Sequence, residues 1–351
     1  MTRDEIVSWL ICDDPSPLYQ RADAVRKEFC GDAIHKRAII EFSNCCERDC
    51  HYCGIRRGNF GLTRYRMEDS QIFAAAQAAA ALGYRTLVLQ SGEDRYDATD
   101  RICFLIRNIK KMTNCAITLC VGERTGEEYR AMREAGADRY LLKFETSDRD
   151  LFRALRPGSS YDERINCLRR LRELDYQVGS GCMVGLPGQT PETLADDILL
   201  MKEFDFDMIG IGPFIPHPDT PLQNSSGGSL EMTLRMIALA RIVTRNAHLP
   251  ATTAIGSIHP QGRQMALRCG ANVIMPNFTP QEFRAHYQIY PNKICINDRP
   301  ADCAVCVDGM IRSLGRTVAT DPGHSLKRGG RGIAQTACKS GEGSYNKRKA
   351  G

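Results

Sequence analysis

The sequence lacks the features that mark membrane-spanning or disordered proteins. None of its 351 residues belong to an apolar run approaching about 18 residues, so a membrane-spanning helix is excluded. The first five residues carry acids and no apolar core, unlike a secretory signal peptide. Hydrophobic residues make up 42% and charged residues 25%, which excludes a mostly disordered or collagen-like chain. We therefore expect a cytoplasmic globular protein.

The positive charge is concentrated at one end of the chain. Residues 325–351 hold seven Lys or Arg and one acid, a net of +6, whereas the whole chain carries +5, so the rest sums to −1. A basic tail on a near-neutral body indicates nucleic-acid binding only weakly, and a solvated terminus rich in Gly, Lys and Ser is the simpler interpretation. We expect a disordered basic tail over residues 319–351, and neither nucleic acid nor a membrane as partner.

Strand-type runs alternate with helix-type segments along most of the chain. Several of the runs are apolar throughout, as expected of parallel strands buried on both faces. The eight candidate strands are residues 38–43, 86–90, 116–120, 139–144, 178–183, 208–212, 251–254 and 272–275. Eight right-handed strand–helix units predict an α/β protein with a (β/α)8 TIM-type barrel, complete or nearly so. An open doubly wound sheet is the alternative.

This pattern divides the chain into four parts. Residues 1–36 are predicted as an N-terminal helical extension, 37–290 as the barrel, 291–318 as a C-terminal segment with three cysteines, and 319–351 as the tail. Barrel enzymes carry their chemistry at the C-terminal ends of the strands. Polar and glycine-rich segments do follow the predicted strands, so we expect the active site there.

Three of the 16 cysteines form a tight group after the first predicted strand. Cys46, Cys50 and Cys53 have the spacing C-x3-C-x2-C. In a reducing compartment such a group indicates a metal or redox site instead of disulfides. A structural zinc site normally has four protein ligands, and no obvious fourth ligand is near. The spacing therefore predicts a 4Fe–4S cluster whose remaining iron is open to a small molecule.

This motif, with Tyr52 beside its last cysteine and a barrel strand before it, resembles that of the radical S-adenosylmethionine (SAM) enzymes. The resemblance implies that the amino and carboxylate groups of SAM bind the open iron. It also implies that an electron from the cluster cleaves SAM to a 5′-deoxyadenosyl radical. The barrel would then orient the cofactor and seal a reactive cavity.

Longer segments resemble one branch of that superfamily, the HydE family of FeFe-hydrogenase maturases. The matching segments are residues 53–57, 88–94, 135–142, 183–190 and 210–221, and the resemblance covers residues 5–318. It implies assembly of the hydrogenase H-cluster, with a radical attack on a cysteine-bound iron carbonyl cyanide complex as the small organometallic substrate. It further implies HydG as the source of that complex, HydF as the carrier of the product, and a separate electron donor.

The resemblance also assigns residues to the site. Contacts to the cofactor are expected from Tyr52, Ser91, Gly92, Glu93, Lys143, Glu145, Arg164 and Met183. The substrate cavity is expected to be lined by Gln90, Thr118, Thr252, Thr253, Met275 and Tyr287. The family has Arg-His-Glu-Thr where this chain reads Lys143-Phe144-Glu145-Thr146, and lysine keeps the charge but not the bidentate fork of arginine.

A second cysteine set, Cys295-x7-Cys303-x2-Cys306, lies beyond the last predicted strand. Three thiolates again indicate an accessory iron–sulfur cluster. The spacing resembles a variable second site of HydE proteins, which implies that it is dispensable for the central chemistry. A zinc site or an unoccupied set is the alternative.

Two related barrels remain as alternatives for the function. A biotin synthase-like, sulfur-inserting enzyme needs an auxiliary cluster held by barrel cysteines and an arginine. Cys120 and Cys182 partly fit, but residues 252–256 include no arginine. A methylornithine synthase-type mutase is expected to lack the second cysteine set.

Overall fold

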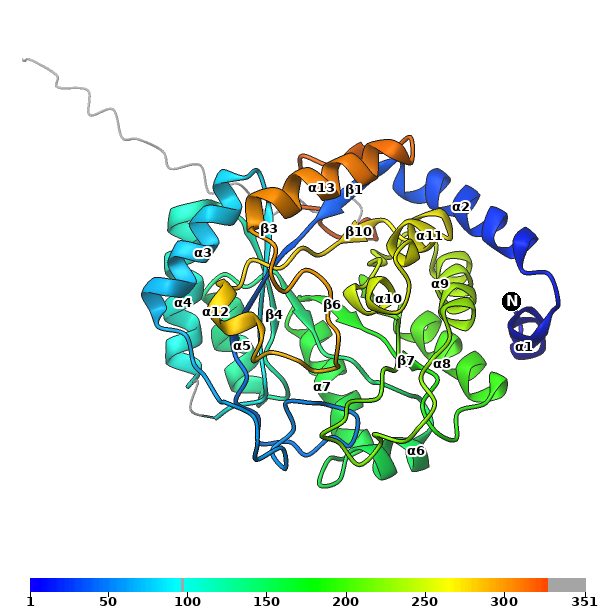
Figure 1. The fold of residues 1–351 in the computed structure, drawn as a ribbon, viewed down its shortest axis with the longest axis horizontal. Helices are drawn as coiled ribbons and strands as arrows, with labels where there is room; N and C mark the ends of the chain where they lie inside the picture. The colour runs from blue at the N-terminus through cyan, green and yellow to red at the C-terminus, as the bar shows by residue number, and fades with distance from the viewer. Residues whose placement is uncertain (96–97, 328–351) are drawn as a thin grey trace, which may run out of the picture.

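The computed structural model describes residues 1–95 and 98–327 (Figure 1). Two helices come first, α1 (Arg3–Ile11) and α2 (Ser16–Cys30). The start of α1 is fixed by a capping box, in which Thr2 and Glu5 each accept a hydrogen bond from the other's backbone N–H. Helix α1 packs on α8 (Pro191–Phe204) and α2 on α9 (Leu230–Thr244). The expected N-terminal helices therefore lie against the outer ring of the fold.

Six parallel strands form the main sheet in the order β2-β3-β4-β5-β6-β8. Their bounds are β2 (Ala38–Ser43), β3 (Thr86–Ser91), β4 (Ala116–Cys120), β5 (Arg139–Leu141), β6 (Gln177–Ser180) and β8 (Met208–Ile209). All six residues of β2 are buried, which explains its nearly continuous apolar sequence. The consecutive parallel order is that of repeated strand–helix units.

Isolated bridges continue this sheet from its last strand back to its first. Met208 of β8 bridges His248, and Pro250 bridges Val273 of β10 (Val273–Ile274). Ile39 of β2 bridges Asn277, the third residue after β10. Parallel pairing thus continues from β8 back to β2, as the (β/α)8 TIM-type fold requires. Between β8 and β2 the pairing consists of isolated bridges instead of extended strand pairs.

Helices cover the outside of the strands, and the strands occupy the middle of the molecule (Figure 1). In chain order the remaining helices are α3 (Asp69–Ala81), α4 (Thr99–Thr113), α5 (Gly126–Glu134), α6 (Arg149–Leu155), α7 (Tyr161–Glu173), α10 (Thr253–Ile258), α11 (Gly262–Arg268), α12 (Gln281–Arg284) and α13 (Pro300–Ser313). A large apolar core fills the space between strands and helices. Among the described residues, no helix combines the length and hydrophobicity needed to cross a membrane.

The structure differs from the expected elements at two places. Residues 251–254 do not form a strand, because the Thr252 side chain accepts from the Ile255 N–H and caps α10. Within the predicted helical extension, β1 (Ala33–Lys36) is a strand that pairs with β10 and with β11 (Thr317–Val318). Two further short strands, β7 (Met183–Val184) and β9 (Gly212–Pro213), pair with each other beyond the ends of β6 and β8.

Residues 319–327, predicted as part of the disordered tail, instead lie across the N-terminal ends of the strands. Arg139 at the start of β5 donates hydrogen bonds to the carbonyl oxygens of Pro322 (2.8 Å) and Gly323 (3.0 Å). His248 Nε2 lies 3.0 Å from His324 O, and Gln177 Nε2 lies 2.9 Å from His324 Nδ1. Residues 328–351 of the predicted tail lie outside the described residues.

Candidate active site

A cavity of about 380 Å³ lies among the strands and opens at their C-terminal ends. It is lined by every residue predicted for the first cysteine triplet, for the cofactor contacts and for the substrate cavity. These lining residues are Cys46, Cys50, Tyr52, Cys53, Gln90, Ser91, Gly92, Glu93, Thr118, Lys143, Glu145, Arg164, Met183, Thr252, Thr253, Met275 and Tyr287. The structure thus brings together residues that span more than 240 positions of the chain.

The loop that carries the cysteine triplet is tied to the end of β3. Gly92 N–H donates to Ser43 O at 3.1 Å, and Glu47 N–H donates to Glu93 O at 2.8 Å. A Cβ atom on Gly92 would lie 2.1 Å from Cys45 O and 2.7 Å from the Cβ of Cys46. Only glycine therefore allows this close approach between strand and loop.

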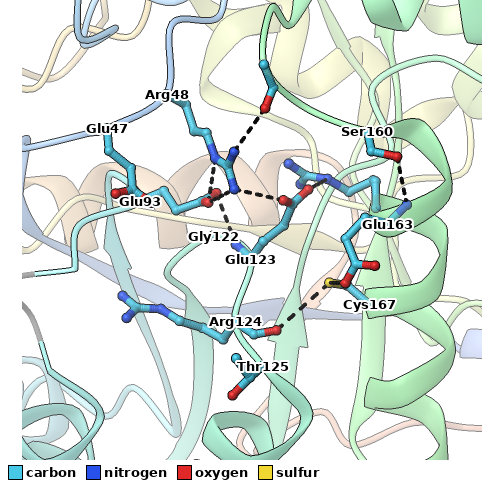
Figure 2. A network of polar contacts seen from close by, with 12 residues as sticks. Glu47, Arg48, Glu93, Gly122, Glu123, Arg124, Thr125, Ser160, Glu163 and Cys167 are labelled. Carbon is cyan, nitrogen blue, oxygen red and sulfur yellow. Dashed lines mark hydrogen bonds and ion pairs between the residues drawn. The ribbon is translucent and has the colours of Figure 1, made fainter.

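Charged side chains form a chain beside the triplet (Figure 2). Arg48 donates to Glu93 at 2.6 Å and to Glu123 at 3.0 Å, and Arg164 pairs with Glu123 at 2.7 Å. The Glu123 N–H also donates to Glu93 at 3.0 Å. The side chains of Glu93, Glu123 and Arg164 are each less than 10% exposed. Such buried charges are tolerated because each one meets an opposite charge.

Glu145 occupies a tight turn after β5. Its φ of +70° lies in the left-handed region, which is uncommon for a residue with a side chain. Its N–H donates to Gly181 O and its carbonyl accepts from Met183 N–H, both at 3.0 Å. Lys143 Nζ lies 3.3 Å from Glu145 Oε2. This turn holds the Glu145 carboxylate and Met183 next to each other at the cavity.

Several residues of the cavity were not predicted from the sequence. Arg156 donates to the Tyr52 hydroxyl at 2.7 Å and is itself buried. Glu41 pairs with Lys293 and accepts from Asn277 at 2.8 Å. Glu41 and Lys293 are both buried. For Glu41 a signal existed, because it is the one charged residue in the otherwise uncharged run 38–43.

Comparisons with known proteins identify relatives of this chain. The family model for the Radical SAM superfamily matches residues 40–201. The FeFe hydrogenase maturase subunit HydE of Thermotoga maritima is 53% identical over 306 residues, covering 87% of this chain and 88% of that protein.

The chain belongs to the HydE family.

More distant relatives share the fold. The 3-methylornithine synthase of Methanosarcina acetivorans is 29% identical and covers 77% of each chain. The crystal structure of methylornithine synthase (PylB) superposes with a TM-score of 0.80 at 24% identity, covering 91% of this chain and 94% of that one. The structural likeness supports the parallel α/β fold of the HydE-family chain.

Membership in the HydE family makes the chain a radical SAM enzyme, whose cofactors are a 4Fe–4S cluster and SAM. The residues present fit these groups. Three thiols reach one cavity. Burial raises the pKa of Cys46 and Cys53 and keeps these thiols protonated in the absence of metal, so iron displaces their protons when it binds. Among the described residues, the buried Thr118 Oγ1 has no hydrogen-bond partner, and Glu145 Oε2 faces only the Lys143 ammonium, at 3.3 Å. A polar ligand in the cavity would satisfy them.

The second cysteine set of this HydE-family chain lies away from the cavity. Cys303 and Cys306 are on α13, and Cys295, at φ +63°, lies near Cys303, which lowers the pKa of the Cys295 thiol. Arg284 fixes the loop through Cys295 O (3.2 Å) and Asp298 O (2.6 Å). Within residues 1–95 and 98–327, no three His, Cys, Asp or Glu side chains are arranged around a single metal ion. An iron–sulfur cluster does not require that arrangement, because each cysteine binds a different iron.

Cys120 and Cys182, the cysteines considered for a biotin synthase-like site, are placed differently from each other. Cys120 lines the cavity, whereas Cys182 is fully buried and does not line it. Burial and the nearby Asp197 carboxylate raise the pKa of the Cys182 thiol. The HydE-family chain therefore does not present these two thiols as a pair facing the cavity.

Proposed function

We propose that this protein is a maturase that helps to build the di-iron part of the H-cluster of FeFe-hydrogenase. The proposed substrate is a small organometallic one, a cysteine-bound iron carbonyl cyanide complex. The observation that carries the proposal is the gathering of all 17 predicted site residues around one cavity, in a chain 53% identical to a HydE protein.

The chain's own residues have proposed roles in binding the cofactors. Cys46, Cys50 and Cys53 would hold the 4Fe–4S cluster with one iron open for SAM. When both are bound, the cluster and SAM supply a 5′-deoxyadenosyl radical. Tyr52, supported by its hydrogen bond from Arg156, would contact the adenine, and Ser91, Gly92 and Glu93 would meet the amino acid end of the cofactor.

Four further side chains complete the proposed cofactor site. Glu145 would accept hydrogen bonds from the ammonium or ribose of SAM, with Lys143 beside it. Arg164 would bind the SAM carboxylate, and its pairing with Glu123 holds the guanidinium at the cavity wall. Met183 would add an apolar contact beside Glu145.

Deeper in the cavity, Gln90, Thr118, Thr252, Thr253, Met275 and Tyr287 are the proposed substrate contacts. Gln90 donates to the Tyr287 hydroxyl at 3.1 Å, and Lys293 lies over the Tyr287 ring at 5.3 Å from its centroid. These contacts fix the ring in one orientation. The walls around them are largely buried, which supports a role in excluding water from a reactive intermediate.

The second cysteine set is proposed to hold an accessory iron–sulfur cluster that the central reaction does not need. Its support is the contact between Cys295 and Cys303, with Cys306 one helical turn further along α13. Its separation from the cavity supports the dispensable role.

The proposed partners are the maturases HydG, as the source of the substrate, and HydF, as the carrier of the product, together with an electron donor. We propose a cytoplasmic location, and the 15 described cysteines, all free, support it because disulfides are rare in that reducing compartment. The barrel of residues 37–290 is proposed as the catalytic part of the chain.

The radical step is tested on anaerobically reconstituted protein. With dithionite and SAM we expect 5′-deoxyadenosine, measured by chromatography. Cys50→Ala is expected to abolish it, because one iron ligand is lost, and Cys303→Ala to leave it largely intact. Equal loss in both variants would contradict the dispensable role of the second set.

The biological role is tested by complementation of a hydrogenase system that lacks its HydE. Restored hydrogen production is expected with the wild-type chain and not with Cys50→Ala. A chain that produces 5′-deoxyadenosine but fails to complement, and instead forms methylornithine from lysine or biotin from its precursor, would overturn the maturase proposal.

A further inference from the structure

The turn that presents Glu145 to the cavity is conformationally unfavourable. A left-handed conformation at a residue with a side chain is strained and persists only where surrounding contacts fix it. The turn begins where Phe144 N–H donates to Ser180 Oγ at 3.1 Å, and it is tight, since Thr146 N–H reaches Phe144 O at 2.9 Å. Other contacts must hold the residues that follow Glu145.

Asp197, a fully buried carboxylate on α8, provides these contacts. Its Oδ1 accepts from both the backbone N–H of Ser147 (2.6 Å) and the Ser147 hydroxyl (2.7 Å). Two hydrogen bonds on one carboxylate oxygen fix both the main chain and the side chain two residues after Glu145. Asp197 does not itself line the cavity.

The other side of the same carboxylate reaches the segment that carries Met183. Oδ2 lies 3.5 Å from Gln189 Nε2, and Asp197 also lies near Cys182, where its charge adds to burial in raising the pKa of the thiol. Gln189 in turn donates to Met183 O at 3.0 Å and accepts from Gly185 N–H at 2.8 Å. One buried group therefore ties together the two segments on either side of the Glu145–Met183 contact.

We propose that Asp197 is a positioning residue for SAM, which it sets through Ser147 and Gln189 by holding Glu145 and Met183 in their places at the cavity. The inference rests on the cofactor roles proposed above for Glu145 and Met183. It adds a residue that does not touch the ligand but determines the geometry of two that do.

The electrostatic setting of Asp197 gives this role a measurable signature. Burial raises the pKa of Asp197 to about 7, against the hydrogen bonds from Ser147, which lower it. As the pH falls through about 7, Asp197 is protonated and loses its negative charge and one acceptor site. Its hydrogen bonds to Ser147 and Gln189 therefore weaken in acid.

Other titratable and charged groups face Asp197. The groups that interact with Asp197 are Cys182 on the β6–β7 segment, Tyr161 on α7 and the neighbouring Asp196, which pairs with Arg3 of α1. The Lys143–Glu145 pair after β5 acts on Cys182. Burial raises the pKa of Cys182 and of Tyr161, so both remain neutral near pH 7.

The test compares Asp197→Asn with Asp196→Asn, the neighbouring carboxylate, which is 44% exposed and pairs with Arg3 at 2.7 Å on the outer face. SAM affinity is measured by equilibrium binding to cluster-reconstituted protein between pH 6 and 8.5. We expect Asp197→Asn to bind SAM about tenfold more weakly at pH 8, as for one lost hydrogen bond to a charged group. The amino group of SAM titrates in the same range, so affinity falls in acid in all three proteins. Wild type and Asp196→Asn should lose more affinity than Asp197→Asn as the pH falls through about 7, because only they carry the Asp197 carboxylate.

A second measurement needs no SAM. Hydrogen exchange of the backbone N–H groups at residues 145–148 and 183–189 is followed in the SAM-free protein. Faster exchange confined to these segments is expected in Asp197→Asn and not in Asp196→Asn. Wild-type affinity and exchange in Asp197→Asn would overturn the positioning role. If Asp197→Asn shows fast exchange but unchanged SAM affinity, the cofactor roles proposed for Glu145 and Met183 are wrong.

Discussion

At the scale of single residues, the site is built from buried charges that are paired. Glu41 and Lys293 meet at the cavity floor, and Asn277 donates to the second oxygen of Glu41 at 2.8 Å. The side chains of Glu41 and Lys293 are 3% and 7% exposed, so neither charge is stabilised by bulk water. A buried pair of this kind contributes little net stability, but removing one partner leaves the other uncompensated.

This asymmetry predicts the effect of Lys293→Met. The variant should lower the free energy of unfolding by about 3–5 kcal/mol, because the Glu41 charge remains buried without its cation. Denaturant unfolding of the anaerobic protein measures the change. The double variant Glu41→Gln/Lys293→Met is the matched control and should recover most of the loss. A single variant no less stable than the double one would contradict this account.

At the scale of elements, the order of strands and the residues at their ends could be predicted, because apolar runs and motif spacing are local signals. Runs such as 38–43 and 86–90 became β2 and β3. The run 251–254 did not become a strand, since a capping threonine overrode β-propensity there. Ion pairs such as Glu41–Lys293 join residues 252 positions apart, and no local pattern specifies such a pair.

The junction between β3 and the cysteine loop gives a prediction for Gly92→Ala. The new methyl group would lie 2.1 Å from the Cys45 carbonyl oxygen, a backbone atom that cannot rotate away. We expect the loop to shift, with less iron bound per chain after reconstitution and a loss of about 1–3 kcal/mol in stability. Iron analysis and absorption spectroscopy measure the first effect.

Gly126→Ala is the control for that substitution. Its Cβ would lie 4.0 Å from Arg170 Cδ, the nearest atom outside the helix, and alanine favours the helix that begins there. It should bind iron as the wild type does. Full iron binding by Gly92→Ala as well would show that the cysteine loop tolerates the shift.

At the scale of the whole molecule, the C-terminal segment closes the end of the fold opposite the cysteine triplet. Arg37 and His248 line the cavity and also contact this segment, at Gly323 O (3.2 Å) and His324 O (3.0 Å). Burial lowers the pKa of both Arg37 and His248. The carbonyl oxygens of the segment thus take the place of water for these groups, and the segment separates the cavity from solvent on this side.

Two truncations test this closure. Ending the chain at Ala319 removes the carbonyl acceptors of Arg139 and Arg37, and hydrogen bonds to charged groups contribute about 1.5–3 kcal/mol each. We therefore expect a lower midpoint of thermal unfolding and a loss of at least about 4.5 kcal/mol for the three bonds. Ending the chain at Lys327 keeps all of these contacts and should lower the midpoint less. Equal midpoints in the two truncated proteins would mean that water replaces the segment without loss of stability. The strands alone would then account for the stability of this end of the fold.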